Sequence, residues 1–146
     1  MSEPEDITTP TGVIHYGGPC RDDYDNIEVY DQPPEGGSPI KLQKAALEAF
    51  RGAERAYGVA TDRPSGERRI QLTGSWRSCS YQRELFAKDP ARYADPDVTG
   101  HTRGIAIDVS TAVPNPELIA RCLRENGWTR TRPDDEPWHW SYGVTV

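Results

Sequence analysis

The 146-residue sequence predicts one α+β domain, with a small, mostly antiparallel sheet and helices packed on one side of it. Two observations lead to this fold class. Short apolar segments with strand alternation are separated by segments with helical periodicity. The C-terminal residues then form two strand patterns, at 128–131 and 137–142, joined by a turn at 132–135. This order favours α+β over a doubly wound parallel sheet.

Composition and charge limit the classes of partner. Hydrophobic residues make up 35% of the chain and charged residues 27%, with a mean hydropathy of −0.77, which indicates a soluble protein with a modest core. The net charge of −6 disfavours nucleic acid or an anionic membrane surface as a partner. No apolar run approaches the length of a membrane span, and we expect a monomer.

The N-terminal region differs in composition from the rest of the chain. Residues 1–37 are rich in Pro, Gly and Asp and predict an extended arm on a domain at 38–146, with one short strand near Ile27–Tyr30. His15, in this arm, is expected to be a surface residue. The acidic segment Met1–Asp6 contains no apolar core, and we do not expect it to be a secretory signal. We therefore expect synthesis in the cytoplasm and action there, unless another route releases the protein.

The three cysteines, Cys20, Cys79 and Cys122, lack C-x-x-C spacing, and an odd number cannot all pair within one chain. Buried or idle thiols are the favoured interpretation. One disulfide with a leftover thiol is the alternative.

The first helix is predicted to begin at Ser38, a good N-cap, with Pro39 at its first position, and to end at Gly58. Its apolar face recurs at helical spacing and is expected to be core. That face comprises Leu42, Ala46, Ala49, Phe50, Ala53 and Tyr57.

The middle of the chain predicts a strand followed by a helix. Residues Ile70–Trp76 alternate as a strand, and Arg77 follows directly at its end. Residues 78–80 can cap a helix at about 80–88. The side chains expected to face inward from it are Tyr81, Leu85 and Phe86.

The alternation at 104–110 predicts another strand, and Asn115 with Pro116 begins a last helix that closes at Gly127. The apolar side of that helix comprises Leu118, Ile119, Cys122 and Leu123. The strand at 104–110 is apolar or small on both faces and yet carries Asp108. A buried, unpaired carboxylate is costly, so Asp108 needs a cation or several donors.

Two histidines can complete a metal site around this carboxylate. His101 lies just upstream of the strand, and His139 lies between two tryptophans on the last strand. Two imidazoles and one carboxylate form a sound three-ligand zinc set that leaves the fourth position for water. Imidazole ligands favour zinc over magnesium or calcium. Glu136, three residues before His139, would be the base that takes the proton of that water.

These motifs resemble the S-x-H-x-x-G-x-A-x-D and E-x-W-H signatures of the zinc D-alanyl-D-alanine carboxypeptidases and dipeptidases. The wider group includes lysostaphin-type peptidases and the hedgehog signalling domain. Thr99 replaces the usual serine and keeps the hydroxyl. The resemblance covers about residues 38–146 and implies the same fold for a zinc peptidase domain there. It is carried by His101, Gly104, Ala106, Asp108, Glu136, Trp138 and His139.

The resemblance also implies roles around the metal. Residues 74–78, Gly-Ser-Trp-Arg-Ser, resemble a family segment whose arginine serves the site, so Arg77 is expected to hold a substrate carboxylate or to stabilise the oxyanion. Glu136 is expected to return its proton to the leaving amine. The remaining candidate substrate contacts, some of which would wall the cleft, are Gln82, Thr99, Trp138 and Tyr142.

The function expected from these residues is a zinc-dependent peptidase that hydrolyses peptidoglycan stem peptides or muropeptides, most specifically a D-alanyl-D-alanine carboxypeptidase. The first alternative is a phage-type endolysin that cuts the L-alanyl-D-glutamate bond. The second is a non-catalytic zinc-binding module of the same fold, against which Glu136 argues, because a metal-only site does not need this carboxylate. An enzyme of this kind would act on the cell wall once released.

Overall fold

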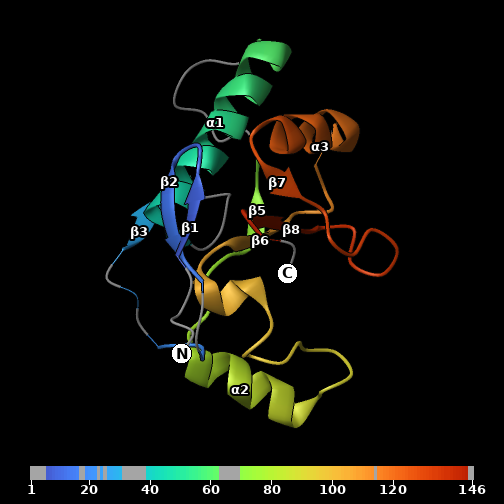
Figure 1. The fold of residues 1–146 in the computed structure, drawn as a ribbon. Coiled ribbons are helices and arrows are strands. Elements are labelled where there is room, and N and C mark those ends of the chain that lie inside the picture. The colour runs from blue at the N-terminus through green and yellow to red at the C-terminus, as the bar shows by residue number, and fades with distance from the viewer. Residues whose placement is uncertain are drawn as a thin grey trace.

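The computed structural model describes residues 6–16, 19–22, 24, 26–30, 39–62, 70–113 and 115–144. Figure 1 shows their arrangement. In chain order the elements are β1 (Asp6–Thr9), β2 (Gly12–His15), β3 (Ile27–Tyr30), β4 (Ile40–Gln43), α1 (Lys44–Thr61), β5 (Leu72–Gly74), α2 (Cys79–Lys88), the 3₁₀ helix η2 (Gly100–Arg103), β6 (Ala106–Val109), α3 (Pro116–Glu125), β7 (Trp128–Thr129) and β8 (His139–Tyr142).

The main sheet has four antiparallel strands in the order β5-β6-β8-β7. Helices α1 and α3 lie together on one side of this sheet, whereas α2 lies apart from them, beyond η2 (Figure 1). The core lies between the sheet and helices α1 and α3, and it contains Phe50, Tyr57, Ile107 and Trp128. The predicted α+β class with a small antiparallel sheet is confirmed, with α2 set apart from the other two helices.

The N-terminal region is integrated into this fold. Strands β1 and β2 form a hairpin, and β3 pairs with β4. Ile14, on β2, is fully buried in the core. The strand predicted near Ile27–Tyr30 is confirmed. The division of the chain at residue 37 remains a prediction.

The first helix begins later than predicted. Residues 40–43 form β4 because they pair with β3, and the helix begins at Lys44. Leu42 is therefore a buried strand residue, and Ser38 lies outside the described residues. Gly58 does not end the helix: it is a buried helical residue, and the left-handed cap is Asp62, at φ 54°.

The other elements follow the predictions with shorter strands. The strand predicted at 70–76 is reduced to β5, which has a register irregularity where it pairs with β6. Helix α2 is capped by the Ser78 side chain, as expected. Of the three side chains predicted to face inward, Leu85 and Phe86 are half-buried, whereas Tyr81 is exposed. The fully buried residues of this peripheral helix are Cys79 and Gln82. The predicted last helix and C-terminal hairpin are present as α3, β7 and β8.

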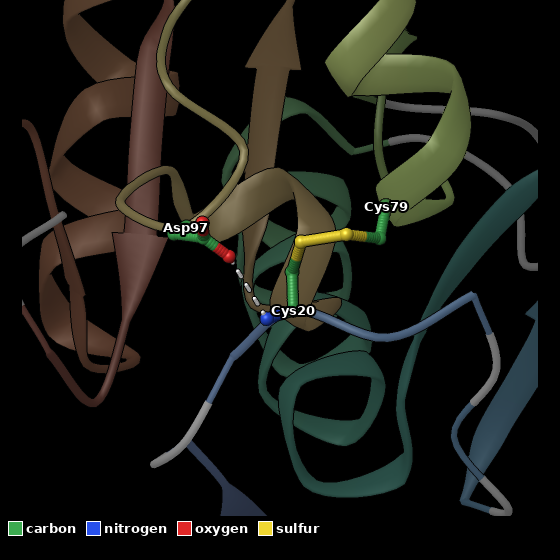
Figure 2. A group of neighbouring side chains, drawn as sticks. All are labelled: Cys20, Cys79 and Asp97. Atoms are coloured by element: carbon green, nitrogen blue, oxygen red, sulfur yellow. Dashed lines mark hydrogen bonds between the residues drawn. A yellow bond between two sulfur atoms is a disulfide. The ribbon is translucent and has the colours of Figure 1, made fainter.

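A disulfide joins Cys20 to Cys79, with Cα atoms 5.4 Å apart (Figure 2). The favoured interpretation of idle thiols was wrong for this pair, whose partners are 59 residues apart in sequence. Cys122 is the leftover thiol, buried in α3. Across the described residues, every helix is too short or too polar to cross a bilayer.

Candidate active site

The loop that carries His101 is built by local sequence. Helix η2 is capped by Thr99, whose hydroxyl accepts a hydrogen bond from the backbone N–H of His101. Gly104 ends η2 in the left-handed region, at φ 72°. A Cβ at this position would lie 2.6 Å from Ile27 Cδ1 and 3.2 Å from the backbone nitrogen of Gln43. Glycine therefore lets the loop turn tightly against β3 and β4.

Residues 75–77 fix the orientation of His101. The ring nitrogen Nδ1 of His101 lies 2.8 Å from the carbonyl oxygen of Ser75. The backbone N–H of Arg77 donates to the carbonyl oxygen of His101, at 3.1 Å. The indole N–H of Trp76 donates to the carbonyl oxygen of Thr102, at 3.3 Å. The segment after β5 thus holds both the backbone and the ring of this histidine.

The structure brings together the three predicted metal ligands. Asp108, on β6, is the direct cross-strand partner of His139, on β8. The Oδ1 atom of Asp108 lies 3.2 Å from Nε2 of His101 and 3.4 Å from Nδ1 of His139. One donor atom from each residue lies within 4.8 Å of the others. Both histidines are buried, at 5% and 4% exposure.

The donor set fits a zinc ion. Because the Ser75 carbonyl only accepts, Nδ1 of His101 carries a hydrogen, and in a neutral ring Nε2 is then an acceptor. This nitrogen faces a carboxylate oxygen, so a cation or an extra proton must lie between them. Burial raises the pKa of Asp108, but when the extra proton is present the hydrogen bonds and charges of His101 and His139 outweigh burial and hold that pKa well below its ordinary value. A charged carboxylate between two imidazoles is a zinc-type ligand set.

These residues lie in an open cleft of about 870 Å³. One wall comes from α2 and the segment after it, and the other comes from residues 131–138. The lining residues include Arg77, Gln82, Phe86, Arg92, Tyr93, Asp95, Val98, Thr99, His101, Asp108, Thr131, Arg132, Asp135, Glu136, Trp138 and His139. The metal set is therefore accessible to a peptide-sized ligand.

Arg77 lies beside the metal set. Its Nη2 atom is 3.7 Å from Oδ2 of Asp108. A Cβ at Gly74 would lie 3.0 Å from that carboxylate oxygen and 3.6 Å from the guanidinium, so glycine leaves room for their approach. Gln82, predicted as a substrate contact, is buried and binds protein groups instead: its Oε1 accepts from Arg77, and its Nε2 donates to the Ala94 carbonyl. It positions Arg77 against the cleft wall.

Glu136 lies in the same cleft, and its carboxylate is 3.3 Å from Nη1 of Arg132. Its carbonyl oxygen also accepts the backbone N–H of His139, at 3.0 Å. The sequence interpretation missed Arg132, which also pairs with Asp135. The spacing of this arginine from two acidic residues, three and four positions later, was the available signal.

The remaining predicted contacts divide into two groups. Thr99 and Trp138 line the cleft, and Trp138 is 37% exposed. Tyr142 does not lie in the cleft, so its prediction as a substrate contact was wrong. It is 2% exposed, packs against Trp128 at 5.4 Å between ring centroids, and bonds the Thr11 hydroxyl at 2.7 Å. Tyr142 is a core residue that joins β8 to the N-terminal hairpin.

The wall formed by the segment after α2 was not predicted as part of the site. It contributes Pro90, Arg92, Tyr93, Asp95 and Val98 to the cleft. The Asp-Pro turns of this segment carry no chemical motif that indicates a binding surface. The segment is held by contacts with Gln82, Thr102 and Arg103, and by one with Cys20 near the N-terminus.

The fold defined by these elements is that of a class of peptidases known from solved structures, although no family model and no curated protein matches the sequence. The structure of the LdcB LD-carboxypeptidase, which reveals the molecular basis of peptidoglycan recognition, aligns with a TM-score of 0.62. The two chains are 15% identical, and the alignment covers 90% of this chain and 75% of LdcB.

Two further structures of the class are VanYB and the vancomycin-resistance D,D-pentapeptidase VanY. VanYB in complex with D-alanine-D-alanine aligns with a TM-score of 0.57 at 16% identity, covering 87% of this chain and 82% of VanYB. A variant of the D,D-pentapeptidase VanY in complex with Zn(II) aligns with a TM-score of 0.58 at 18% identity. The alignment covers 87% of this chain and 84% of the VanY variant. The resemblance noted in the sequence is thus confirmed at the level of the fold.

Proposed function

We propose that this protein is a zinc-dependent peptidase that removes the C-terminal D-alanine from peptidoglycan stem peptides. The observation that carries this proposal is the position of Arg77, 3.7 Å from Asp108 in the same cleft as the buried His-Asp-His set. A guanidinium beside a metal set can hold a free peptide carboxylate next to the bond to be cut. The fold shared with solved carboxypeptidases supports the same function.

The metal would be held by His101, Asp108 and His139, which offer two imidazole nitrogens and a carboxylate oxygen. When bound, zinc supplies a Lewis acid that polarises a carbonyl group and makes a water molecule more acidic. The Ser75 carbonyl fixes the His101 ring so that Nε2 is available as a ligand. The open cleft leaves room for a substrate beside the three residues that would hold the metal.

Glu136 would act as the general base and acid. Its carboxylate lies in the cleft with the metal set, where it can accept a proton from the attacking water and return it to the leaving amine. Arg132 pairs with Oε2 of this carboxylate, at 3.3 Å, and would help to hold it in the cleft. In this scheme the proton passes through Glu136 alone.

Arg77 would bind the terminal carboxylate of the substrate, with Gln82 holding the guanidinium in place. Thr99 and Trp138 line the cleft and would contact the remainder of the stem peptide. Because this substrate belongs to the cell wall, the protein would act there after its release, as a monomer.

A defined muropeptide with a pentapeptide stem tests the proposal. Incubation with the zinc-loaded protein should release free D-alanine and leave a tetrapeptide, as read by mass spectrometry. A product that lacks L-alanine would instead identify an L-alanyl-D-glutamate endopeptidase. Binding of the muropeptide without cleavage would identify a non-catalytic zinc-binding module.

A further inference from the structure

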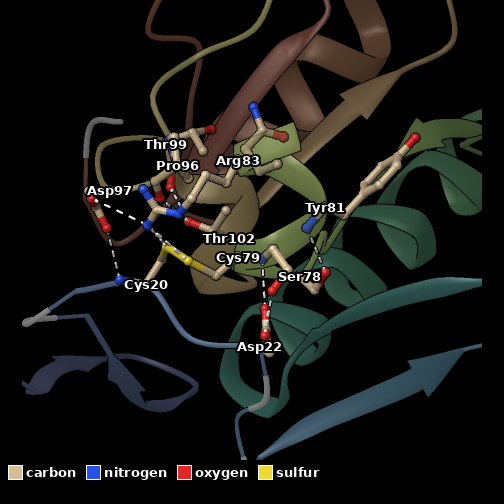
Figure 3. The surroundings of a disulfide bond; sticks show 12 residues. Cys20, Asp22, Ser78, Cys79, Tyr81, Arg83, Pro96, Asp97, Thr99 and Thr102 are labelled. Atoms are coloured by element: carbon tan, nitrogen blue, oxygen red, sulfur yellow. Dashed lines mark hydrogen bonds and ion pairs between the residues drawn. A yellow bond between two sulfur atoms is a disulfide. The ribbon is translucent and has the colours of Figure 1, made fainter. Parts of the chain in front are cut away.

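The Cys20–Cys79 disulfide lies where the N-terminal region meets the first turn of α2 (Figure 3). Two more contacts join these segments. The Asp22 carboxylate accepts hydrogen bonds from the backbone N–H and the hydroxyl of Ser80, at 2.7 and 2.6 Å. The backbone N–H of Cys79 donates to the carbonyl oxygen of Arg21, at 3.2 Å. The start of α2 is thus anchored to residues 20–22.

A third segment meets the disulfide at Asp97. The carboxylate of Asp97 accepts the backbone N–H of Cys20 at 3.3 Å (Figure 2), and it lies 3.7 Å from the guanidinium of Arg83. Arg83 extends from α2, and its Nη2 atom also contacts both sulfur atoms, at 3.5 Å from Cys79 and 3.7 Å from Cys20. The disulfide and Arg83 therefore connect the N-terminal region, α2 and the loop around Asp97.

Two of these three segments build one wall of the candidate cleft. Helix α2 contributes Gln82, which positions Arg77, and the loop around Asp97 contributes Val98 and Thr99. The proposed metal ligands are held mainly by other contacts, namely the pairing of β6 with β8 and the bond from His101 to Ser75, although Thr99 also caps the turn that carries His101. Opening the disulfide would therefore loosen the substrate wall more than the metal set.

The surroundings of the two sulfur atoms favour reduction of this bond. Cys79 is the first residue of α2, and Arg83 lies one turn later with its guanidinium at the sulfur. A helix N-terminus and a neighbouring guanidinium both stabilise a thiolate, and a stabilised thiolate is the better leaving group in thiol–disulfide exchange. Cys20 is the more exposed partner: it is half-buried, whereas Cys79 is 9% exposed.

We propose that the Cys20–Cys79 disulfide is a redox-responsive clamp on the substrate wall, opened by a dithiol reductant. A thiolate of the reductant attacks Sγ of Cys20, the S–S bond breaks, and Cys79 leaves as a thiolate beside Arg83. The second thiol of the reductant then displaces Cys20, so the reductant becomes a disulfide and the protein gains two electrons and two protons. The effect on peptide hydrolysis rests on the proposed function, whereas the opening of the wall does not.

Hydrogen exchange with and without dithiothreitol tests the clamp directly, with the redox state read from the mass of the alkylated protein. Amides of residues 79–88 and 95–99 should exchange at least about tenfold faster after reduction, while those of β6 and β8 change less than about twofold. Equal protection of residues 79–88 in the two states would overturn the proposal. The Cys20→Ser/Cys79→Ser variant should show the exchange rates of the reduced protein, and dithiothreitol should not change them. The exchange rates of Cys122→Ala should respond to dithiothreitol as those of the parent do.

Two further measurements separate a responsive clamp from a passive cross-link. Arg83→Gln should slow reduction of the disulfide about tenfold, because the leaving thiolate loses its guanidinium; an unchanged rate would overturn the role of Arg83. On a pentapeptide substrate, reduction should raise KM at least about fivefold, with kcat and zinc content nearly unchanged. If the protein cleaves no stem peptide, the proposed function fails, and the exchange experiment still decides the clamp.

Discussion

His101 turns one ring nitrogen to the carbonyl oxygen of Ser75 and the other to Asp108, so its hydrogen-bonding roles are fixed before any ligand arrives. A histidine held in this way exposes a lone pair toward the carboxylate. Two groups that attract cations thus face each other in a buried site. This relationship makes metal binding the first property to measure.

We expect about one equivalent of zinc per chain after mild purification. The His101→Ala/His139→Ala variant should lose this zinc, because two of three ligands are gone. His15→Ala is the matched control: this histidine pairs with the Asp6 carboxylate on the N-terminal hairpin and should leave the zinc content unchanged. Metal analysis by mass spectrometry gives the answer. Full zinc binding by the double variant would rule out the proposed site.

Glu136→Gln should keep the zinc and lose about 10²-fold or more in kcat, because an amide cannot accept the proton of the attacking water. Asp135→Asn is the control, since Asp135 lines the same cleft and pairs with the same Arg132. It should stay within about threefold of the parent. Turnover near the parent value in Glu136→Gln would remove this carboxylate from the reaction, and loss of zinc would make it a ligand.

Amidation of the substrate's C-terminus should lower kcat/KM by about 10- to 100-fold, which corresponds to about 1–3 kcal/mol for a charge-assisted contact. Arg77→Ala should erase most of this preference for the free carboxylate. Arg92→Ala removes another guanidinium from the cleft and should keep the preference. Kinetics on paired free and amidated substrates measure the effect. An amide cleaved as well as the free acid would contradict recognition of a chain end.

Tyr142→Phe should lower the free energy of unfolding by about 0.5–1.5 kcal/mol and leave KM unchanged. The ring keeps its packing on Trp128, and only the hydrogen bond to Thr11 is lost. Urea unfolding of this variant, of Thr11→Ala and of the double variant would isolate the pair as a coupling energy. A rise in KM without a change in the free energy of unfolding would show that Tyr142 contacts the substrate after all.

Much of the fold could be predicted from the sequence in segments whose structure depends on the apolar periodicity of neighbouring residues. Helix α3 and the hairpin of β7 and β8 are set by nearby residues and were predicted well. The start of α1 was not, because the apolar spacing of residues 40–43 fits a helix until β3 pairs with them. The disulfide was equally hidden, since nothing local relates Cys20 to a residue 59 positions away.

The candidate site divides in the same way. His101, Asp108 and His139 could be predicted because their side chains are unusual for the apolar strands and tight turn that carry them. Tyr142 was misplaced because its position on β8 gives no sign that its ring belongs to the core side. Arg132 could have been recognised from its spacing to Asp135 and Glu136, whereas nothing in the sequence of the segment after α2 indicates that it lines the cleft.

The direct pairing of Asp108 with His139 has a consequence for how the sheet assembles. Both residues lie on the two inner strands, and a slip of one residue between β6 and β8 would turn one of these side chains to the opposite face. An ion that needs both ligands can bind only the correct alignment. Zinc would therefore bind and stabilise the correct register of β6 and β8 during folding, and it would favour correctly aligned chains over misaligned ones.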